Sequence, residues 1–182
     1  LFRHLQTSSD RFILAPGEKG LVMVCFTLPS FDVVFKLIRD KFPPQKNILR
    51  QDVLAKYDLV FRHDRAGRLV DAQEFKLLKF PKSRFAPDLL QELLTETSNT
   101  VHDEGDELLI DHLYIERRMT PLNLYVRTAT RAQAEKAVLD YGQAIRDLAV
   151  TNIFPGDLLL KNFGVTRHGR VIFYDYDELC LV

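Results

Sequence analysis

Cysteine is scarce in this sequence, long hydrophobic runs are missing, and the two signs of charge cancel. The two cysteines, Cys25 and Cys180, form neither a CxxC pair nor a metal-ligand spacing, so we interpret both as buried or incidental thiols in a reducing compartment. The longest apolar run, residues 21–26, falls far short of the ~20 residues that cross a bilayer. Because 25 basic residues balance 25 acidic ones, nothing attracts the chain generally to nucleic acid or to an anionic membrane. We expect a cytoplasmic protein.

The chain does have enough apolar residues to build a core. It has 182 residues, of which 46% are hydrophobic and 27% charged, as in a folded chain of one domain or slightly more. No internal repeat or low-complexity segment is present. The sequence begins without Met and stops inside an apolar run, so we expect it to be a piece of a longer protein.

The order of predicted elements indicates an α+β fold. Hydrophobic periodicity and turn residues predict helices at 48–63, from Pro87 onward and at 131–150, and strands at 11–14, 21–27, 33–38, 73–80, 108–115, 158–160, 164–166 and 170–174. The helix at 131–150 should bury a stripe that includes Ala137, Val138 and Leu148. We therefore predict an N-terminal lobe with an antiparallel sheet (1–120), the start of a helical C-terminal lobe (121–182), and a nucleotide cleft between them.

Three oxygen-bearing side chains near the C-terminal end carry the most specific chemical signal. Asp157 is followed after five residues by Asn162, and Asn162 after thirteen residues by Asp175. At such intervals the first residue can accept a proton from an attacking hydroxyl, while the other two can hold a Mg²⁺ ion that bridges phosphates. Each residue alone has an ordinary interpretation as a turn former or a strand end.

Two glycines and a lysine precede these residues in an order that strengthens the signal. Gly17 and Gly20 lie in a turn where the backbone can approach phosphate oxygens, although in isolation a plain hairpin is the better explanation of them. Lys36 lies on a predicted strand, from which its ammonium can reach the α- and β-phosphates. Together with the later Asp, Asn and Asp, this order and spacing resemble those of a protein kinase, which implies a two-lobed kinase-like fold that uses ATP and Mg²⁺.

The sequence departs from the usual kinase pattern in the catalytic loop. Pro155–Gly156–Asp157 replaces His-Arg-Asp, and Leu159 stands where a lysine is expected. Lys161 is the candidate to stabilise charge at the γ-phosphate instead. Asp175–Tyr176–Asp177 replaces Asp-Phe-Gly, and Asp177 adds a carboxylate near the metal.

The acidic partner of Lys36 is left open by the sequence. In kinases a helix supplies a glutamate to this lysine. The candidates are Asp52 and Asp58 on one predicted helix, and Glu92 and Glu96 on the next.

Longer segments resemble bacterial isocitrate dehydrogenase kinase/phosphatase over nearly the whole chain. They are Ala15–Leu21, Phe26–Phe31, His112–Met119, Asn152–Asp157, Lys161–Arg170 and Tyr174–Glu178. The resemblance implies an enzyme that phosphorylates a serine of isocitrate dehydrogenase and also removes that phosphate, and so controls flux between the tricarboxylic acid cycle and the glyoxylate bypass. It also implies one nucleotide site for both activities, and it leaves a homodimer of the full-length protein open.

The resemblance also implies a role for each site residue. The ATP loop would comprise Ala15, Pro16, Gly17, Glu18, Lys19, Gly20 and Leu21, with Lys36 as the phosphate-binding lysine. Asp157 would be the catalytic acid/base, Asn162 and Asp175 the Mg²⁺ ligands, and Asp71 the acid for dephosphorylation. Two alternatives stay open: a small-molecule kinase of the aminoglycoside or choline type, and a non-catalytic nucleotide-binding fragment.

Overall fold

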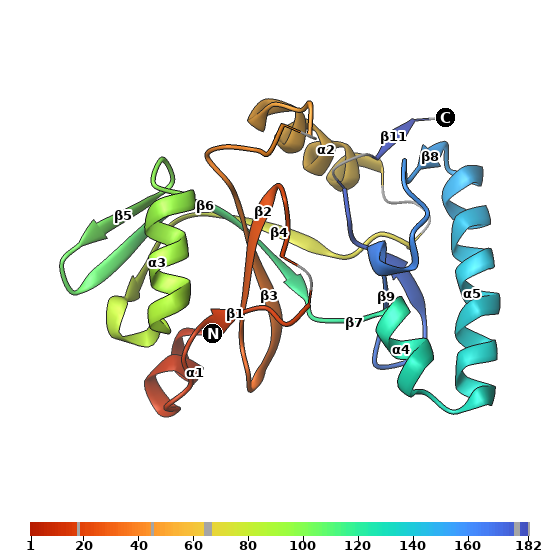
Figure 1. Ribbon diagram of the computed structural model, residues 1–182, viewed down its shortest axis with the longest axis horizontal. Helices are drawn as coiled ribbons and strands as arrows, with labels where there is room; N and C mark the ends of the chain where they lie inside the picture. The colour runs from red at the N-terminus through yellow and green to blue at the C-terminus, as the bar shows by residue number, and fades with distance from the viewer. Residues whose placement is uncertain (18, 45, 64–66, 177–178, 182) are drawn as a thin grey trace. The chain divides into compact units, whose positions relative to one another are not determined.

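The computed structural model describes residues 1–17, 19–44, 46–63, 67–176 and 179–181, which group into two compact units (Figure 1). The first unit comprises Leu1–Arg50 and Ala72–Arg117, and the second comprises Gln51–Asp71 and Arg118–Val182. The division into domains 1–120 and 121–182 stays a prediction. The two compact units differ from the predicted domains, because residues 51–71 group with the C-terminal part of the chain.

The first unit is built on an antiparallel sheet in the order β1-β2-β3-β6-β4, with β5 paired to β6. Its strands are β1 (Ile13–Leu14), β2 (Met23–Leu28), β3 (Phe31–Ile38), β4 (Ala72–Pro81), β5 (Val101–Glu104) and β6 (Glu107–Arg117). Large apolar and β-branched residues fill β2 and β3, as strands require. The predicted strands of this part are therefore confirmed, and β5 is added to them.

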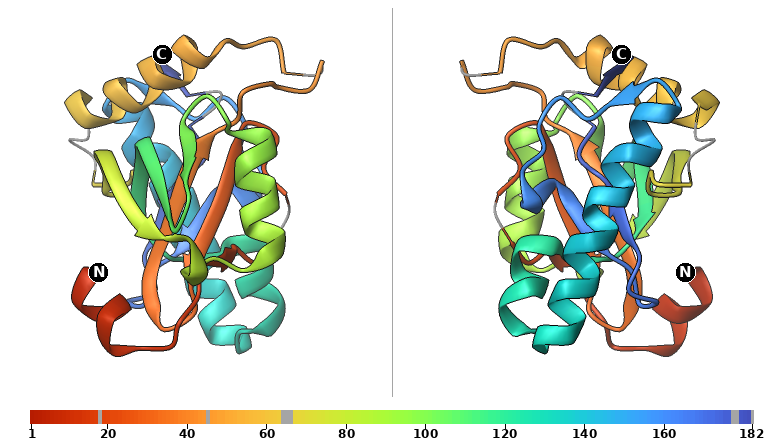
Figure 2. Two further views of the ribbon diagram at one scale, coloured as in Figure 1. Left: turned by 90° about the vertical axis from the view of Figure 1, so that its left-hand side faces the viewer. Right: turned by 90° about the vertical axis from the view of Figure 1, so that its right-hand side faces the viewer.

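Helix α3 (Pro87–Glu96) packs on this sheet and closes the core of the first unit (Figure 2). Its Pro87 suits the first helical turn, and Leu89 and Leu93 are fully buried. Phe12 lies at the centre of an aromatic cluster with Phe26, Phe35, Phe80 and Phe85. A short helix, α1 (Phe2–Thr7), and a 3₁₀ turn, η1 (Lys82–Arg84), complete the unit.

The second unit combines helices with two small sheets. The helices are α2 (Arg50–His63), α4 (Leu122–Thr128) and α5 (Arg131–Val150), and the 3₁₀ turn is η2 (Leu160–Asn162). One sheet has the order β10-β9-β7, from β7 (Thr120–Pro121), β9 (Phe163–Val165) and β10 (Val171–Phe173), and the other pairs β8 (Ile153–Phe154) with β11 (Cys180–Leu181). The predicted strands at 164–166 and 170–174 are thus confirmed as a hairpin. The α+β class is confirmed as well.

Helix α5 begins and ends where the sequence predicts. Thr130 and Gln133 form a capping box, in which each side chain bonds the backbone N–H of the other residue. The predicted buried stripe is only partly right, because Ala137 and Leu148 are buried but Val138 is 52% exposed. The helix packs on α4, β8 and β10 along one narrow face, and Val138 lies beside that face. Figure 2 shows α4 next to the start of α5.

A second correction concerns residues 158–160. The predicted strand is wrong: the chain runs there as a loop into η2. This tight turn forms because the N–H of Asn162 bonds back to the carbonyl of Leu159 over 2.9 Å.

None of the helices in the described residues has the length and hydropathy of a membrane-spanning segment.

Candidate active site

The loop after α5 places Asp157 next to a tyrosine of that helix. Gly156 has φ +80°, a conformation that glycine adopts without strain. The half-buried Asp157 accepts the N–H of Leu159 over 2.9 Å. The Tyr141 hydroxyl donates to the carbonyl of Leu158 over 2.5 Å, and burial together with the charge of Asp157 raises the pKa of Tyr141. The loop is thus tied to α5 directly beside the predicted acid/base.

Two hydrogen bonds of the Leu159 backbone connect Asp157 to Asn162. The N–H of Leu159 donates to Asp157, and the carbonyl of the same residue accepts the N–H of Asn162. Asn162 is 5% exposed, so its position is well determined by its surroundings. Lys161, the predicted γ-phosphate residue, is exposed in the same turn.

The β9–β10 hairpin brings Asn162 and Asp175 to the same end. Phe163 pairs with Phe173, and the N–H of Tyr174 donates to the carbonyl of Asn162 over 3.1 Å. Asn162 precedes one strand and Asp175 follows the other, so both lie just beyond the last rung of the ladder. The structure therefore brings together the backbones of these two predicted metal ligands.

The donor set at this end suits Mg²⁺. An amide oxygen and a carboxylate are hard ligands, and Mg²⁺ commonly takes only one or two protein groups and completes its shell with water and substrate phosphates. No group of three His, Cys, Asp or Glu side chains that could hold a metal occurs within the described part of the chain. Asp177, the predicted third carboxylate, lies outside the described residues.

Asp71 follows a segment that runs alongside β10. Leu69 forms a parallel bridge with Phe173, whose N–H donates to the carbonyl of Arg68 over 2.8 Å and whose carbonyl accepts the N–H of Val70 over 3.1 Å. The buried hydroxyl of Tyr176 then donates to the carbonyl of Val70 over 3.0 Å. Asp71 is exposed and comes directly after Val70. The predicted phosphatase acid thus lies on a segment bonded to the residues on either side of Tyr174 and Asp175.

The glycine turn belongs to the first unit and is held from both ends. The N–H of Ala15 donates to the carbonyl of Cys25 over 2.9 Å, and the Arg39 Nε donates to the carbonyl of Gly20 over 3.0 Å. A Cβ on Gly20 would lie 2.6 Å from the carbonyl oxygen of Met23, so only glycine fits there without a shift of the backbone. Gly17 has φ +126°, which also favours glycine.

The other members of the predicted ATP loop are mostly exposed. Pro16, Lys19 and Leu21 face solvent to differing degrees, and Glu18 lies outside the described residues. The Lys19 ammonium lies 3.2 Å from a carboxylate oxygen of Glu92. Burial raises the pKa of Glu92, but hydrogen bonds from Arg39 and Lys19 outweigh it and hold that pKa below its usual value.

Lys36 pairs with a residue that the sequence did not suggest. Its Nζ lies 2.8 Å from Oε2 of Glu116, and their side chains are 11% and 2% exposed. Lys36 is opposite Tyr114 in the ladder, so Glu116 is its diagonal neighbour on the same face of the sheet. All four candidates on helices are therefore replaced by a strand residue.

Three of the four helical candidates, Asp58, Glu92 and Glu96, pair with arginines. Asp58 pairs with Arg62 one helical turn away over 2.8 Å. Glu92 and Glu96 bind the buried Arg39 over 2.6 and 3.4 Å. One signal could have found Glu116: it occupies the buried alternation of β6 with Leu108, Ile110 and Tyr114, where a lone carboxylate needs a cationic partner.

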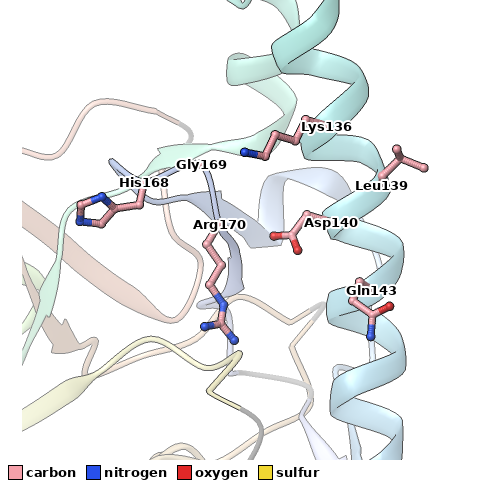
Figure 3. Close-up of a pocket in the computed structure, with 7 residues that line it drawn as sticks. All are labelled: Lys136, Leu139, Asp140, Gln143, His168, Gly169 and Arg170. Atoms are coloured by element: carbon pink, nitrogen blue, oxygen red, sulfur yellow. The ribbon is translucent and has the colours of Figure 1, made fainter.

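A shallow hollow of about 430 Å³ in the second unit lies apart from these residues (Figure 3). It is formed by one face of α5 and the β9–β10 turn, and its lining residues are Lys136, Leu139, Asp140, Gln143, His168, Gly169 and Arg170. None of the predicted site residues lines it.

The Lys–Glu pair on the sheet of the first unit and the Asp, Asn and Asp residues around the hairpin of the second unit are typical of a protein-kinase-like domain. The kinase-domain model of isocitrate dehydrogenase kinase/phosphatase (AceK) matches residues 10–182. The chain belongs to the isocitrate dehydrogenase kinase/phosphatase family.

Curated proteins that are similar to this chain carry the name of the same family. The chain is 62% identical over 180 residues to the isocitrate dehydrogenase kinase/phosphatase of Anaeromyxobacter dehalogenans (strain 2CP-C), an alignment that covers 99% of the chain and 31% of the relative. It is 59% identical to that of Anaeromyxobacter sp. (strain Fw109-5), with the same coverage. The Burkholderia multivorans (strain ATCC 17616 / 249) protein is 57% identical over 98% of the chain and 30% of its own length. The chain thus spans just under a third of the length of these relatives.

Proposed function

We propose that the protein containing this chain transfers the γ-phosphoryl group of ATP to a serine of isocitrate dehydrogenase and also hydrolyses the phosphoserine that results. This activity would control flux between the tricarboxylic acid cycle and the glyoxylate bypass. The observation that carries the proposal is the connected set of hydrogen bonds from the Asp157 carboxylate through the backbones of Leu159 and Asn162 to Tyr174, next to Asp175. Family membership supports the protein substrate.

In the kinase direction Asp157 orients the serine hydroxyl and takes its proton as Oγ bonds to the γ-phosphorus and the bond to the ADP oxygen breaks. Asn162 and Asp175 would hold Mg²⁺, which would supply the positive charge that neutralises the phosphate oxygens. Lys36, fixed by Glu116, binds the α- and β-phosphates. Lys161 stabilises charge at the γ-phosphate.

The backbone N–H groups of Gly17, Lys19, Gly20 and Leu21 hold the triphosphate in the same role as a glycine-rich loop. The turn is anchored to Arg39 through the carbonyl of Gly20.

In the phosphatase direction Asp71 positions a water, whose oxygen bonds to the phosphoserine phosphorus as the bond from phosphorus to the serine Oγ breaks and Oγ takes up a proton released by the water. ADP and Mg²⁺ would occupy the same place as in the kinase direction. The bonds of Val70 to Phe173 and Tyr176 support this assignment, because they bring the Asp71 backbone beside the Asp175 segment. Asp71 and Asp175 are therefore assigned to one phosphate.

Phosphate transfer from radiolabelled ATP to purified isocitrate dehydrogenase tests the proposal, with a panel of small alcohols run in parallel. We expect labelled isocitrate dehydrogenase only, and release of that label when ADP replaces ATP. Asp157→Ala should abolish transfer with modest loss of ATP binding, whereas Asp58→Asn, an exposed carboxylate of the same unit, should leave it unchanged. Labelling of the alcohols alone would establish the small-molecule kinase in its place, and no labelling of either would refute both kinases.

A further inference from the structure

One arginine of the second unit is almost completely buried among charged partners. Arg68 has a side chain that is 6% exposed, and its two terminal nitrogens bind the two carboxylate oxygens of Asp140, each over 2.9 Å. Its Nε donates to Asp147 over 2.7 Å, and one terminal nitrogen also donates to the carbonyl of Val171 over 3.0 Å. This bidentate geometry is specific to arginine, since a lysine ammonium cannot reproduce the planar fork.

The two carboxylates connect Arg68 to further elements. Asp140 also accepts the N–H of Val171, the first residue of β10, over 2.7 Å, and Asp147 accepts the side-chain amide of Gln143 over 2.6 Å. Figure 3 shows Asp140 and Gln143 projecting from the same helix, α5. The guanidinium thus joins three parts of the unit: α5, the start of β10 and its own segment.

The network is charged at neutral pH. Burial raises the pKa of Asp140, but hydrogen bonds from Arg68 and from the N–H of Val171 outweigh it, and the pKa lies below its usual value. Hydrogen bonds from Arg68 and Gln143 lower the pKa of Asp147. A charged, buried, multiply bonded group of this kind holds one geometry well and tolerates little rearrangement.

Arg68 lies three residues before Asp71, and the intervening residues place Asp71 through their backbone. Asp71 itself is exposed, so its position follows from how Leu69 and Val70 lie on β10. The kinase residues have additional support: β9 pairs with both β10 and β7, and Tyr141 binds the loop of Asp157. Loosening of Arg68 should therefore displace Asp71 more than Asp157 or Asn162.

We propose that Arg68 is a positioning residue for dephosphorylation, which fixes the segment of Asp71 against α5 and β10 through Asp140 and Asp147. This inference rests on the proposed function and deepens its phosphatase half. A merely structural role for the same network predicts a different result, because it would weaken both reactions to the same extent.

Arg68→Lys in the protein expressed from its complete reading frame tests the proposal. We expect the phosphatase kcat to fall about tenfold to a hundredfold, the range expected when an acid is misplaced by about 1 Å, while the kinase kcat and the KM for ATP change less than about threefold. Arg62→Lys is the matched control, since Arg62 is an exposed arginine paired with Asp58 in the same unit. It should leave both activities unchanged.

Asp147→Asn is the second variant. It removes the charge of one partner of Arg68 and keeps the bidentate pair with Asp140, so it tests the same prediction if Arg68→Lys does not fold.

A double variant that combines the Arg68 substitution with Asp71→Ala gives the sharpest readout. If Arg68 acts through Asp71, the Arg68 substitution should cause no further loss of phosphatase activity in the Asp71→Ala background.

Equal losses of kinase and phosphatase activity, or full additivity with Asp71→Ala, would overturn the positioning role. These outcomes differ from failure of the proposed function, in which the unsubstituted protein neither labels isocitrate dehydrogenase nor releases the label.

Discussion

The pair between Lys36 and Glu116 gives the most direct test of how the first unit is held together. The Lys36 Nζ and the Glu116 Oε2 lie 2.8 Å apart, and the two side chains are 11% and 2% exposed. At an effective dielectric constant of about 20, their attraction is roughly 6 kcal/mol, most of which offsets the cost of removing both charges from water. The pair as a whole therefore adds little, but either charge left alone is costly.

Glu116→Leu leaves the ammonium buried without its carboxylate and should lower the free energy of unfolding by about 3–5 kcal/mol. Adding Lys36→Met to that variant should restore most of the loss, because an apolar pair of similar volume fills the same space. Urea unfolding of this chain, followed by circular dichroism, measures both values.

The control is the exposed pair Lys79–Glu104, with an N–O distance of 2.5 Å and side chains 51% and 39% exposed. Glu104→Gln should change the free energy of unfolding by less than about 1 kcal/mol. If the single Glu116→Leu variant is as stable as the double variant, the reasoning about an uncompensated buried charge is refuted.

Three further predictions concern packing, the glycine turn and acid stability. Phe12→Ala, which empties the centre of a cluster at 0% exposure, should cost about 3–5 kcal/mol in the same urea experiment, and a loss below about 1 kcal/mol would contradict that position. Gly20→Ala forces the backbone away from the Met23 carbonyl and should raise the KM for ATP, and an unchanged KM would separate this turn from nucleotide binding. The pKa of Asp140 is lowered in the folded state, so the stability from its pair with Arg68 is present above the unfolded value of 3.8 and is lost as pH falls through the folded value. Asp140→Asn should accordingly flatten the drop in melting temperature below about pH 4, and an unchanged drop would count against the pair.

Local patterns in the sequence were sufficient for much of the fold. Hydrophobic periodicity predicted the helix at 131–150, and turn residues separated the strands at 164–166 and 170–174, because helices and turns depend on residues that are close in the chain. The spacing of Asn162 and Asp175 is predictive for the same reason, since a single hairpin brings both residues to one end.

Contacts between distant parts of the chain could not be predicted in this way. Arg68 and Asp140 are 72 residues apart, and nothing near Arg68 in the sequence indicates that it is buried. The partner of Lys36 was sought on a helix because kinases usually place it there, whereas strand pairing brings Glu116 to it. Exposure of Val138 was missed because periodicity identifies an apolar stripe but not the width of the face that another element covers.

The strand origin of Glu116 has a consequence for regulation. Protein kinases can be switched off by swinging a helix outward, which carries the glutamate away from the lysine. Here both partners lie on adjacent strands of one sheet, and their backbones cannot separate without breaking the ladder between β3 and β6. An outward swing of a helix therefore cannot separate this pair, and any change at Lys36 has to come from rotation of the two side chains or from distortion of the sheet itself.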